Sequence, residues 1–173
     1  MVLERYPKAV VLDLDYTLWP FWCDTHVVRP LKAVSDVVVI DSCNLELSFY
    51  EEVESILLEL KEYDVKIIGA SRTGTPDIAK DLLTMLHIRG NPAITYFDCL
   101  EWGTGSKTRH IQRAAKKLKL TKELANGDFV LFDDEKRNRD VSSINCHFIH
   151  VPNEGLTRHT FIQGLRAWNK ATK

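Results

Sequence analysis

Residues 9–15 read AVVLDLD, an apolar run of four residues that ends in two aspartates separated by a leucine. Such a short, continuous apolar run is typical of a strand that is buried on both faces, as in a parallel sheet. The two aspartates, Asp13 and Asp15, lie where this strand ends. Ligands of open α/β sheets bind beyond the carboxyl ends of the strands. The stretch therefore predicts both a central strand and a polar site at its end.

The rest of the chain alternates apolar strands with amphipathic helices. Further strands are expected at 65–70, 93–97, 129–132 and 146–151, and helices at 51–62, 75–86, 106–118, 138–144 and 157–171. This alternation predicts an α/β fold in three layers, with a mainly parallel five-stranded sheet covered by helices on both faces. Between the first strand and the first helix, residues 37–40 and 45–47 predict a β-hairpin.

The composition is that of an ordinary globular protein. A length of 173 residues suits one domain spanning 1–173, and 45% of the residues are hydrophobic. The net charge of −1 argues against a protein that binds nucleic acid through overall basic charge. The four cysteines form no C-x-x-C pair, which favours reduced thiols in the cytoplasm or the nucleus over a zinc or disulfide framework. No segment approaches the roughly 20 apolar residues of a membrane span, so no membrane partner is expected.

Acidic residues follow two strands that the sheet is expected to bring together. Asp13 and Asp15 end the first strand, and Asp133 and Asp134 end the strand at 129–132. Four carboxylates at one edge of a sheet repel each other and raise each other's pKa unless a cation neutralises them. A single D-x-D would be read as strand-end residues that cap turns, but the second acidic pair favours a metal site. Carboxylate and carbonyl oxygens are the ligands that Mg²⁺ prefers.

Hydroxyl and cationic side chains in the same region point to a phosphate group. Thr17, Ser71, Arg72 and Lys107 carry donors that suit phosphate oxygens. Lys107 also begins a predicted helix, whose free N–H groups add positive potential. A lysine at such a position is by itself more often a solvated surface residue, so its significance comes from the neighbouring motifs.

The order of these motifs resembles that of the haloacid dehalogenase (HAD) superfamily of phosphatases. Residues 13–17, DLDYT, match its D-x-D-x-T signature, and Ser71, Lys107 and residues 133–134 match its other three motifs in order. Longer stretches are similar to the small eukaryotic magnesium-dependent phosphatase family, namely residues 12–26, 70–73, 105–107 and 132–138. The resemblance spans about residues 8–165, and it is loose over 27–50 and 88–104, where we expect substrate choice to be determined.

The resemblance implies a Mg²⁺-dependent phosphomonoesterase that works through an aspartyl-phosphate. It implies Asp13 as the nucleophile and Asp15 as the general acid and base. It implies a Mg²⁺ ion held by the Asp13 side chain, the Asp15 backbone carbonyl and Asp134. Asp133 and Asn138 would act on these ligands and would not contact the ion themselves.

The resemblance also implies the substrate contacts and the substrate class. Ser71 and Lys107 would hold phosphoryl oxygens, with Thr17 as a further donor, and Arg72 would bind another part of the substrate. The implied substrate is phosphotyrosine, free or in a protein, or a small phosphorylated sugar or glycated amine.

The spacing of the motifs leaves little room for a cap domain. Only 35 residues separate Ser71 from Lys107, and the 33 residues of 18–50 suit a hairpin flap. We therefore expect an open site, walled on one side by Trp19, Phe21, Trp22 and the 37–47 hairpin. Core packing is an equally good reading of the aromatic residues.

Two other functions are compatible with parts of the sequence. A non-enzymatic phospho-acceptor module of receiver type also carries acidic residues, Thr and Lys on a parallel sheet. Its phosphorylated Asp ends the third strand, with Thr and then Lys later in the chain. Here Asp98 follows the third expected strand, but the matching Thr and Lys do not follow in that order. A nucleic-acid-binding module would use the basic stretch 107–122, which has seven lysines and arginines and no acid. Such a run is usually a solvated helix face, so nucleic acid is not the expected partner.

Overall fold

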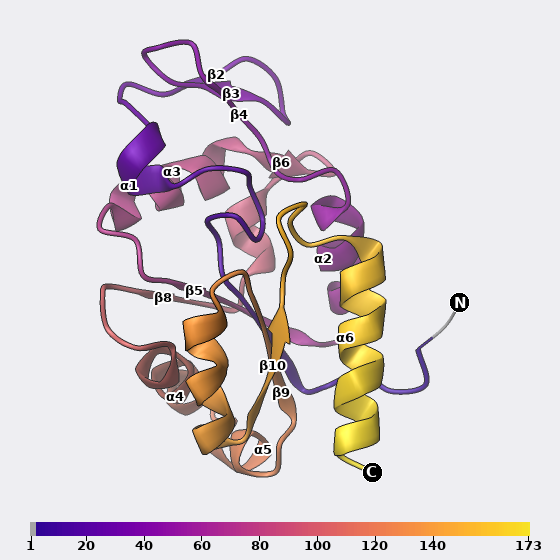
Figure 1. Cartoon of the computed structure of the whole chain (residues 1–173). Coiled ribbons are helices and arrows are strands. Elements are labelled where there is room, and N and C mark those ends of the chain that lie inside the picture. Colours follow the sequence, from indigo (N-terminus) through magenta and orange to yellow (C-terminus); the bar gives the residue numbers. More distant parts are fainter. Residues whose placement is uncertain (1–2) are drawn as a thin grey trace.

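The computed structural model describes residues 3–173 and shows a three-layer α/β fold (Figure 1). Its central sheet has five strands in the order β10-β9-β1-β5-β8, and all neighbours are parallel. The strands are β1 (Ala9–Leu12), β5 (Lys66–Ser71), β8 (Cys99–Trp102), β9 (Phe129–Asp133) and β10 (Cys146–His150). The expected parallel five-stranded sheet is confirmed, with β1 at its centre.

Helices cover both faces of this sheet. One face packs on α2 (Val53–Glu62), α3 (Pro76–Met85) and α6 (Arg158–Ala171). The other packs on α4 (Lys107–Lys117), α5 (Thr121–Ala125) and the 3₁₀ helix η2 (Lys136–Ile144). Side chains of β1 alternate between the two cores: Val10 and Leu12 join the first, and Ala9 and Val11 the second. All four are fully buried, which explains why this strand reads as a continuous apolar run.

The strand expected at 93–97 is wrong. Ala93–Tyr96 is a 3₁₀ helix, η1, and the strand that pairs with β5 is β8, in which Cys99 lies opposite Ile68. Strand β8 contains a buried acid, Glu101, that an apolar-run criterion does not select. Its carboxylate forms ion pairs with Arg113 at 2.9 Å and with Lys117 at 2.8 Å, and both cations lie on α4. Two of the seven cations of the 107–122 stretch therefore neutralise a buried carboxylate of the sheet.

Residues 18–50, which we call the flap, lie between β1 and α2. The flap holds a short helix, α1 (Cys23–His26), and an antiparallel sheet of β2 (Lys32–Ala33), β3 (Val39–Ile40) and β4 (Glu46–Leu47). Strands β3 and β4 form the expected hairpin with shorter strands than expected, and β2 adds a third strand. A small hairpin of β6 (His87–Ile88) and β7 (Asn91–Pro92) lies nearby (Figure 1). Within residues 3–173 there is no cap domain beyond these pieces.

Candidate active site

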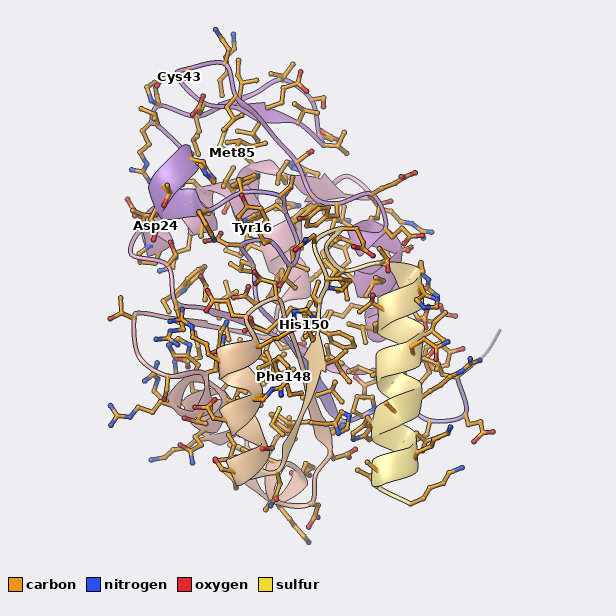
Figure 2. All side chains as sticks on the ribbon, viewed as in Figure 1. Tyr16, Asp24, Cys43, Met85, Phe148 and His150 are labelled. Atoms are coloured by element: carbon orange, nitrogen blue, oxygen red, sulfur yellow. The ribbon has the colours of Figure 1, made fainter. Side chains whose placement is uncertain are left out.

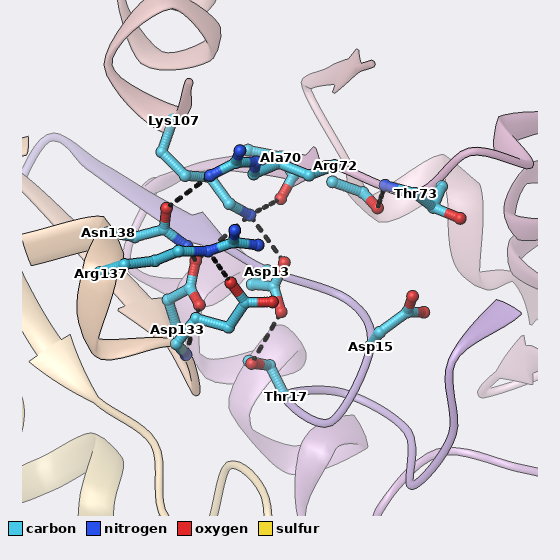
Figure 3. Close-up of polar contacts among 12 residues, drawn as sticks. Asp13, Asp15, Thr17, Ala70, Arg72, Thr73, Lys107, Asp133, Arg137 and Asn138 are labelled. Carbon is cyan, nitrogen blue, oxygen red and sulfur yellow. Dashed lines mark hydrogen bonds and ion pairs between the residues drawn. The ribbon is translucent and has the colours of Figure 1, made fainter. Parts of the chain in front are cut away.

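Asp13 lies immediately after β1, and neighbouring groups hold both oxygens of its carboxylate. Its backbone amide donates to the Phe132 carbonyl at 3.1 Å, which fixes it against β9. Oδ1 accepts a hydrogen bond from the Lys107 ammonium at 2.6 Å, and Oδ2 accepts one from the Thr17 hydroxyl at 3.2 Å (Figure 3). Asp13 also lines a pocket of about 330 Å³ at this edge of the sheet. The carboxylate is therefore oriented before any ligand arrives.

Asp15 lies on the far side of the turn that follows β1. Tyr16, at a left-handed φ of 57°, makes this turn tight. The Asp15 carboxylate accepts the indole N–H of Trp19 at 2.8 Å and the backbone amide of Cys23 at 3.3 Å. Figure 3 shows it apart from the cluster around Asp13, and it lines the same pocket. Burial is the main cause that raises the Asp15 pKa above its ordinary value.

Lys107 is the first residue of α4, and its side chain is buried in the middle of the site. Its ammonium contacts Asp13 at 2.6 Å and Asp133 at 3.3 Å, and it donates to the carbonyl of Ala70 at the end of β5. Burial disfavours the charged form of this lysine, but the two carboxylates outweigh burial and raise its pKa. The expected position of Lys107 at a helix start is confirmed, whereas the alternative of a solvated surface lysine is wrong.

Asp133, the last residue of β9, binds the surrounding loops together. Its Oδ1 accepts the Glu135 amide at 2.8 Å, and its Oδ2 accepts the Asn138 side-chain amide at 2.9 Å. The Asn138 oxygen in turn accepts a long hydrogen bond of 3.4 Å from Arg72. These contacts commit both Asp133 oxygens and link the ends of β5 and β9.

The carboxylates of Asp13, Asp133 and Asp134 suit a hard divalent cation. Their oxygens all lie within 4.8 Å of one another. Burial raises the pKa of Asp13 to about 7 and that of Asp133 to about 7, and it raises the pKa of Asp134 to about 6. Lys107 neutralises part of this charge through Asp13 and Asp133, and a bound Mg²⁺ ion would stabilise the ionised form of all three carboxylates. Asp133 is fully buried and does not line the pocket, whereas Asp13 lines it and Asp134 is partly exposed, so Asp13 and Asp134 are the better placed to contact the ion directly.

The structure brings most of the expected site residues to one pocket. Asp13, Asp15, Ser71, Arg72, Lys107 and Asn138 line it. Thr17 does not line it, because its hydroxyl is fully buried against Asp13. The Thr17 hydroxyl orients Asp13 in this structure, and its contact with a phosphate stays a prediction.

Six further residues line the pocket, and of these only Trp22 was expected at the site: Trp22, Asp24, Thr25, Thr73, Glu135 and Arg137. Thr73 donates its backbone amide to the Ser71 hydroxyl at 3.2 Å. Asp24, on α1, accepts the Gly74 amide at 3.3 Å and so ties the flap to the loop after β5. All six lie within the longer stretches that resemble the magnesium-dependent phosphatase family, residues 12–26, 70–73 and 132–138, and that membership is their sequence signal.

The expected aromatic wall is right for one residue of three. Trp19 and Phe21 are 0% and 4% exposed, and their rings stack at 5.3 Å in the core, whereas Trp22 is 46% exposed and lines the pocket. Trp19 faces inward because its indole N–H donates to Asp15. The hairpin at 37–47 contributes no residue to the pocket lining, so that part of the expected wall is also wrong.

Comparison with known proteins identifies the family. The profile of the Acid Phosphatase family matches residues 5–171. The chain belongs to this family. It is 38% identical over 170 residues to Magnesium-dependent phosphatase 1 of Homo sapiens, an alignment that covers 98% of this chain and 91% of the human protein. It is 39% identical over 151 residues to a HAD-like hydrolase superfamily protein of Schizosaccharomyces pombe, covering 84% of this chain and 86% of that protein.

Solved structures show the same fold. A HAD-superfamily hydrolase from Ehrlichia chaffeensis covers 99% of this chain and 100% of its own, with a TM-score of 0.61 and 11% identity. Together the comparisons confirm the expected Mg²⁺-dependent phosphatase of the HAD superfamily, a phosphomonoesterase that acts on a phosphorylated substrate. Within residues 3–173, none of the helices combines the length and the hydrophobicity that a membrane crossing requires.

Proposed function

We propose that this phosphatase hydrolyses phosphate monoesters through an aspartyl-phosphate formed on Asp13. The observation that carries the proposal is the Asp13 carboxylate itself, which lines the pocket and is oriented through both oxygens by Lys107 and Thr17. In the first step an Asp13 oxygen forms a bond to phosphorus, and the bond between phosphorus and the ester oxygen breaks. Bound Mg²⁺ would offset the negative charge of the carboxylates and of the phosphoryl group.

Asp15 is proposed as the general acid and base. In its protonated form it would give its proton to the departing ester oxygen, and as a carboxylate it would then take a proton from the water that attacks the aspartyl-phosphate. Its raised pKa supports the protonated form at the first step. The hydrogen bonds from Trp19 and the Cys23 amide hold it in one orientation for both steps.

Ser71 and Lys107 are proposed to hold the phosphoryl group, and Arg72 another, anionic part of the substrate. The Ser71 oxygen accepts a hydrogen bond from the Thr73 amide, which leaves its O–H free to donate to a phosphoryl oxygen. The contacts of the Arg72 guanidinium with Asn138, at 3.4 Å, and with the Thr104 carbonyl, at 3.5 Å, are long, so it can be drawn to an anion at little cost. The contact of Lys107 with Asp133, at 3.3 Å, is longer than that with Asp13 and is the one that a phosphoryl oxygen would replace.

Among the possible substrates, aryl phosphates such as phosphotyrosine suit this pocket best. The exposed Trp22 ring stacks on His26 at 5.4 Å and meets the Tyr16 ring edge-on at 5.1 Å. A ring held in this way offers a fixed flat face to an aromatic leaving group. Small phosphorylated sugars and glycated amines remain the second candidate class.

The four free cysteines support a reducing compartment, such as the cytoplasm or the nucleus.

A turnover screen tests this proposal. Phosphotyrosyl peptides, free phosphotyrosine and a panel of phosphorylated sugars and amines would be assayed with Mg²⁺, using wild type and Asp13→Asn. We expect turnover by wild type, fastest on the aryl esters, and none by the variant, whose amide is a poor nucleophile. Circular dichroism would check that the variant is folded. Turnover by Asp13→Asn within about tenfold of wild type would refute Asp13 as nucleophile, since loss of a covalent nucleophile normally costs far more.

A further inference from the structure

A second concave surface adjoins the catalytic pocket. This groove of about 910 Å³ runs along η2 and strand β10, and its lining includes Arg137, Arg139, His147 and Phe148. In Figure 1 the same face turns toward the viewer, with β10 between the orange helix η2 and the yellow helix α6. Figure 2 shows Phe148 and His150 lying between those two helices. The expected site accounts for no part of this surface.

One side chain lines both the groove and the catalytic pocket. Arg137 lines both, and its side chain is 60% exposed. It forms an ion pair with Glu135, which lines the pocket but not the groove. A ligand that enters the groove therefore meets, at one end, the residue that borders the proposed phosphate site.

The charge of the groove suits an acidic ligand. Arg137 and Arg139 face a single acidic lining residue, Asp140. The Arg139 guanidinium lies 6.0 Å from the centre of the Phe148 ring, so a cation and an apolar ring lie together in the groove lining. Burial lowers the pKa of His147, and its neutral ring supplies hydrogen-bonding groups rather than charge. The groove thus offers arginines around a partly apolar floor, a combination that favours acidic side chains on an extended chain.

Strand β10 adds backbone groups to the groove. Within the described residues it pairs with β9 on one side only, because it is the last strand of the sheet. The Val151 amide donates to the Asp133 carbonyl on the β9 side, and backbone groups alternate along a parallel strand. The backbone groups of Phe148, which lines the groove, therefore point to the open edge. Such an edge accepts an extended peptide through main-chain hydrogen bonds.

We infer that this groove binds an extended acidic segment of a polypeptide substrate, beside the residue that carries the phosphoryl group. The inference rests on the proposed function, and it makes the substrate a phosphoprotein or phosphopeptide. A peptide fits better than a nucleic acid, because the open edge pairs with peptide groups and a phosphodiester backbone has none.

Binding tests the groove without relying on catalysis. A fluorescently labelled, unphosphorylated peptide rich in Asp and Glu would be titrated with wild type, Arg139→Glu and Lys116→Glu. Lys116 is exposed on α4 and lines neither the groove nor the pocket, so it is the matched control. We expect Arg139→Glu to weaken binding by about tenfold or more, and Lys116→Glu to change it by less than about twofold. Equal weakening by both variants, or equal binding of a neutral peptide of the same length, would overturn the inference. So would tighter binding of a single-stranded oligonucleotide that Arg139→Glu abolishes.

Kinetics separate this inference from the proposed function. The ratio of kcat/KM for a phosphotyrosyl peptide with acidic flanks to that for one with neutral flanks should be well above one in wild type and fall toward one in Arg139→Glu. A ratio of one in a wild type that turns over both peptides would overturn the inference and leave the proposed function intact. Peptide binding that depends on Arg139, in an enzyme that hydrolyses no phosphate ester, would overturn the proposed function and leave the groove as a peptide site.

Discussion

Lys107 supplies the positive charge that balances the carboxylates at the centre of the site. Its side chain is 1% exposed, and it lies between Asp13 and Asp133. Removing one partner of a buried ion pair leaves the other charge unpaired, at a cost of about 3–5 kcal/mol. A change at Lys107 therefore alters stability and chemistry together. Asp15, which forms no ion pair with a cation among residues 3–173, is the better residue for testing a chemical role.

Asp15→Asn should slow the enzyme by an amount that depends on the leaving group. An amide cannot donate the proton that a poor leaving group needs, whereas p-nitrophenolate departs without one. We expect a loss of about 100-fold or more on an alkyl phosphate and a clearly smaller loss on p-nitrophenyl phosphate. Steady-state kcat on both esters measures it. Equal losses on the two esters would show that Asp15 is not the acid.

Residue identities at the site were largely predictable, but their contacts were not. The motif spacing indicated Asp13, Lys107 and Asp133 because parallel strands end at one edge of the sheet. Nothing in the sequence shows that the Thr17 hydroxyl turns inward to Asp13 rather than toward the pocket. That outcome depends on the tight turn at Tyr16, whose φ of 57° is uncommon for a residue other than glycine.

At the scale of elements, the flap is organised around Asp41. Its carboxylate accepts the backbone amides of Val28 at 3.0 Å, Cys43 at 2.8 Å and Leu45 at 2.9 Å. The flap is also joined to α3 by Arg29, which contacts Asp77 at 3.1 Å and Asp81 at 2.5 Å. These hydrogen bonds and ion pairs hold the flap in one position beside the pocket.

Asp41→Asn should lower the thermal stability, and the loss should depend on pH. The hydrogen bond from the Val28 amide is the main cause that holds the Asp41 pKa below its ordinary value. A depressed folded-state pKa stabilises the fold above the unfolded pKa of about 4, and this contribution is lost as the pH falls through the folded value. The difference in Tm between wild type and variant should therefore be full at pH 7 and narrow below about pH 4. Asp36→Asn, on the same flap, is the control, and a difference in Tm that does not vary with pH would contradict this role.

Trp22→Ala tests the wall that the flap gives to the pocket. Loss of a stacking partner worth about 0.5–1.5 kcal/mol should raise KM for aryl phosphates by roughly 2- to 10-fold. Sugar phosphates, which have no aromatic ring, should be affected less. Val34→Ala, also exposed on the flap but outside the pocket lining, is the matched control. An equal rise of KM for both substrate classes would make the ring part of the scaffold.

Errors in the predicted elements share one physical origin. The strand at 93–97 was expected from its apolar residues, whereas β8 contains Glu101, whose burial depends on cations from α4. Trp19 and Trp22 are equally aromatic in the sequence, yet it is the Trp19 indole that donates to a partly buried carboxylate, that of Asp15. Tertiary partners decided both outcomes, and local pattern does not reveal them.

At the scale of the whole molecule, the parallel sheet gathers distant residues into one charged site. The ion pair of Asp13 with Lys107 joins residues 94 positions apart. The carboxylates of Asp13, Asp133 and Asp134 lie at the carboxyl ends of the adjacent strands β1 and β9. A site of this composition favours a bound cation in the folded state, so metal binding and stability should be linked.

Removal of metal should stop the enzyme and lower its stability. EDTA should abolish turnover, and Mg²⁺ should restore it and raise Tm, because the ion binds the folded state and relieves repulsion between carboxylates. Ca²⁺ should inhibit, since it is larger than Mg²⁺ and binds more oxygen ligands. It would therefore misplace the attacking oxygen of Asp13. Asp134→Asn should reduce the rise in Tm with Mg²⁺. Full turnover in excess chelator would contradict the role of the metal.

Trapping the intermediate tests the central claim most directly. The enzyme would be mixed with p-nitrophenyl phosphate and Mg²⁺, quenched rapidly and reduced with borohydride, which converts an aspartyl-phosphate to homoserine. Peptide mass spectrometry would then locate the change. The proposed mechanism predicts homoserine at position 13 in wild type, and none when substrate is left out. Unmodified Asp13 in an enzyme that turns over in the same mixture, or homoserine at another position, would contradict it.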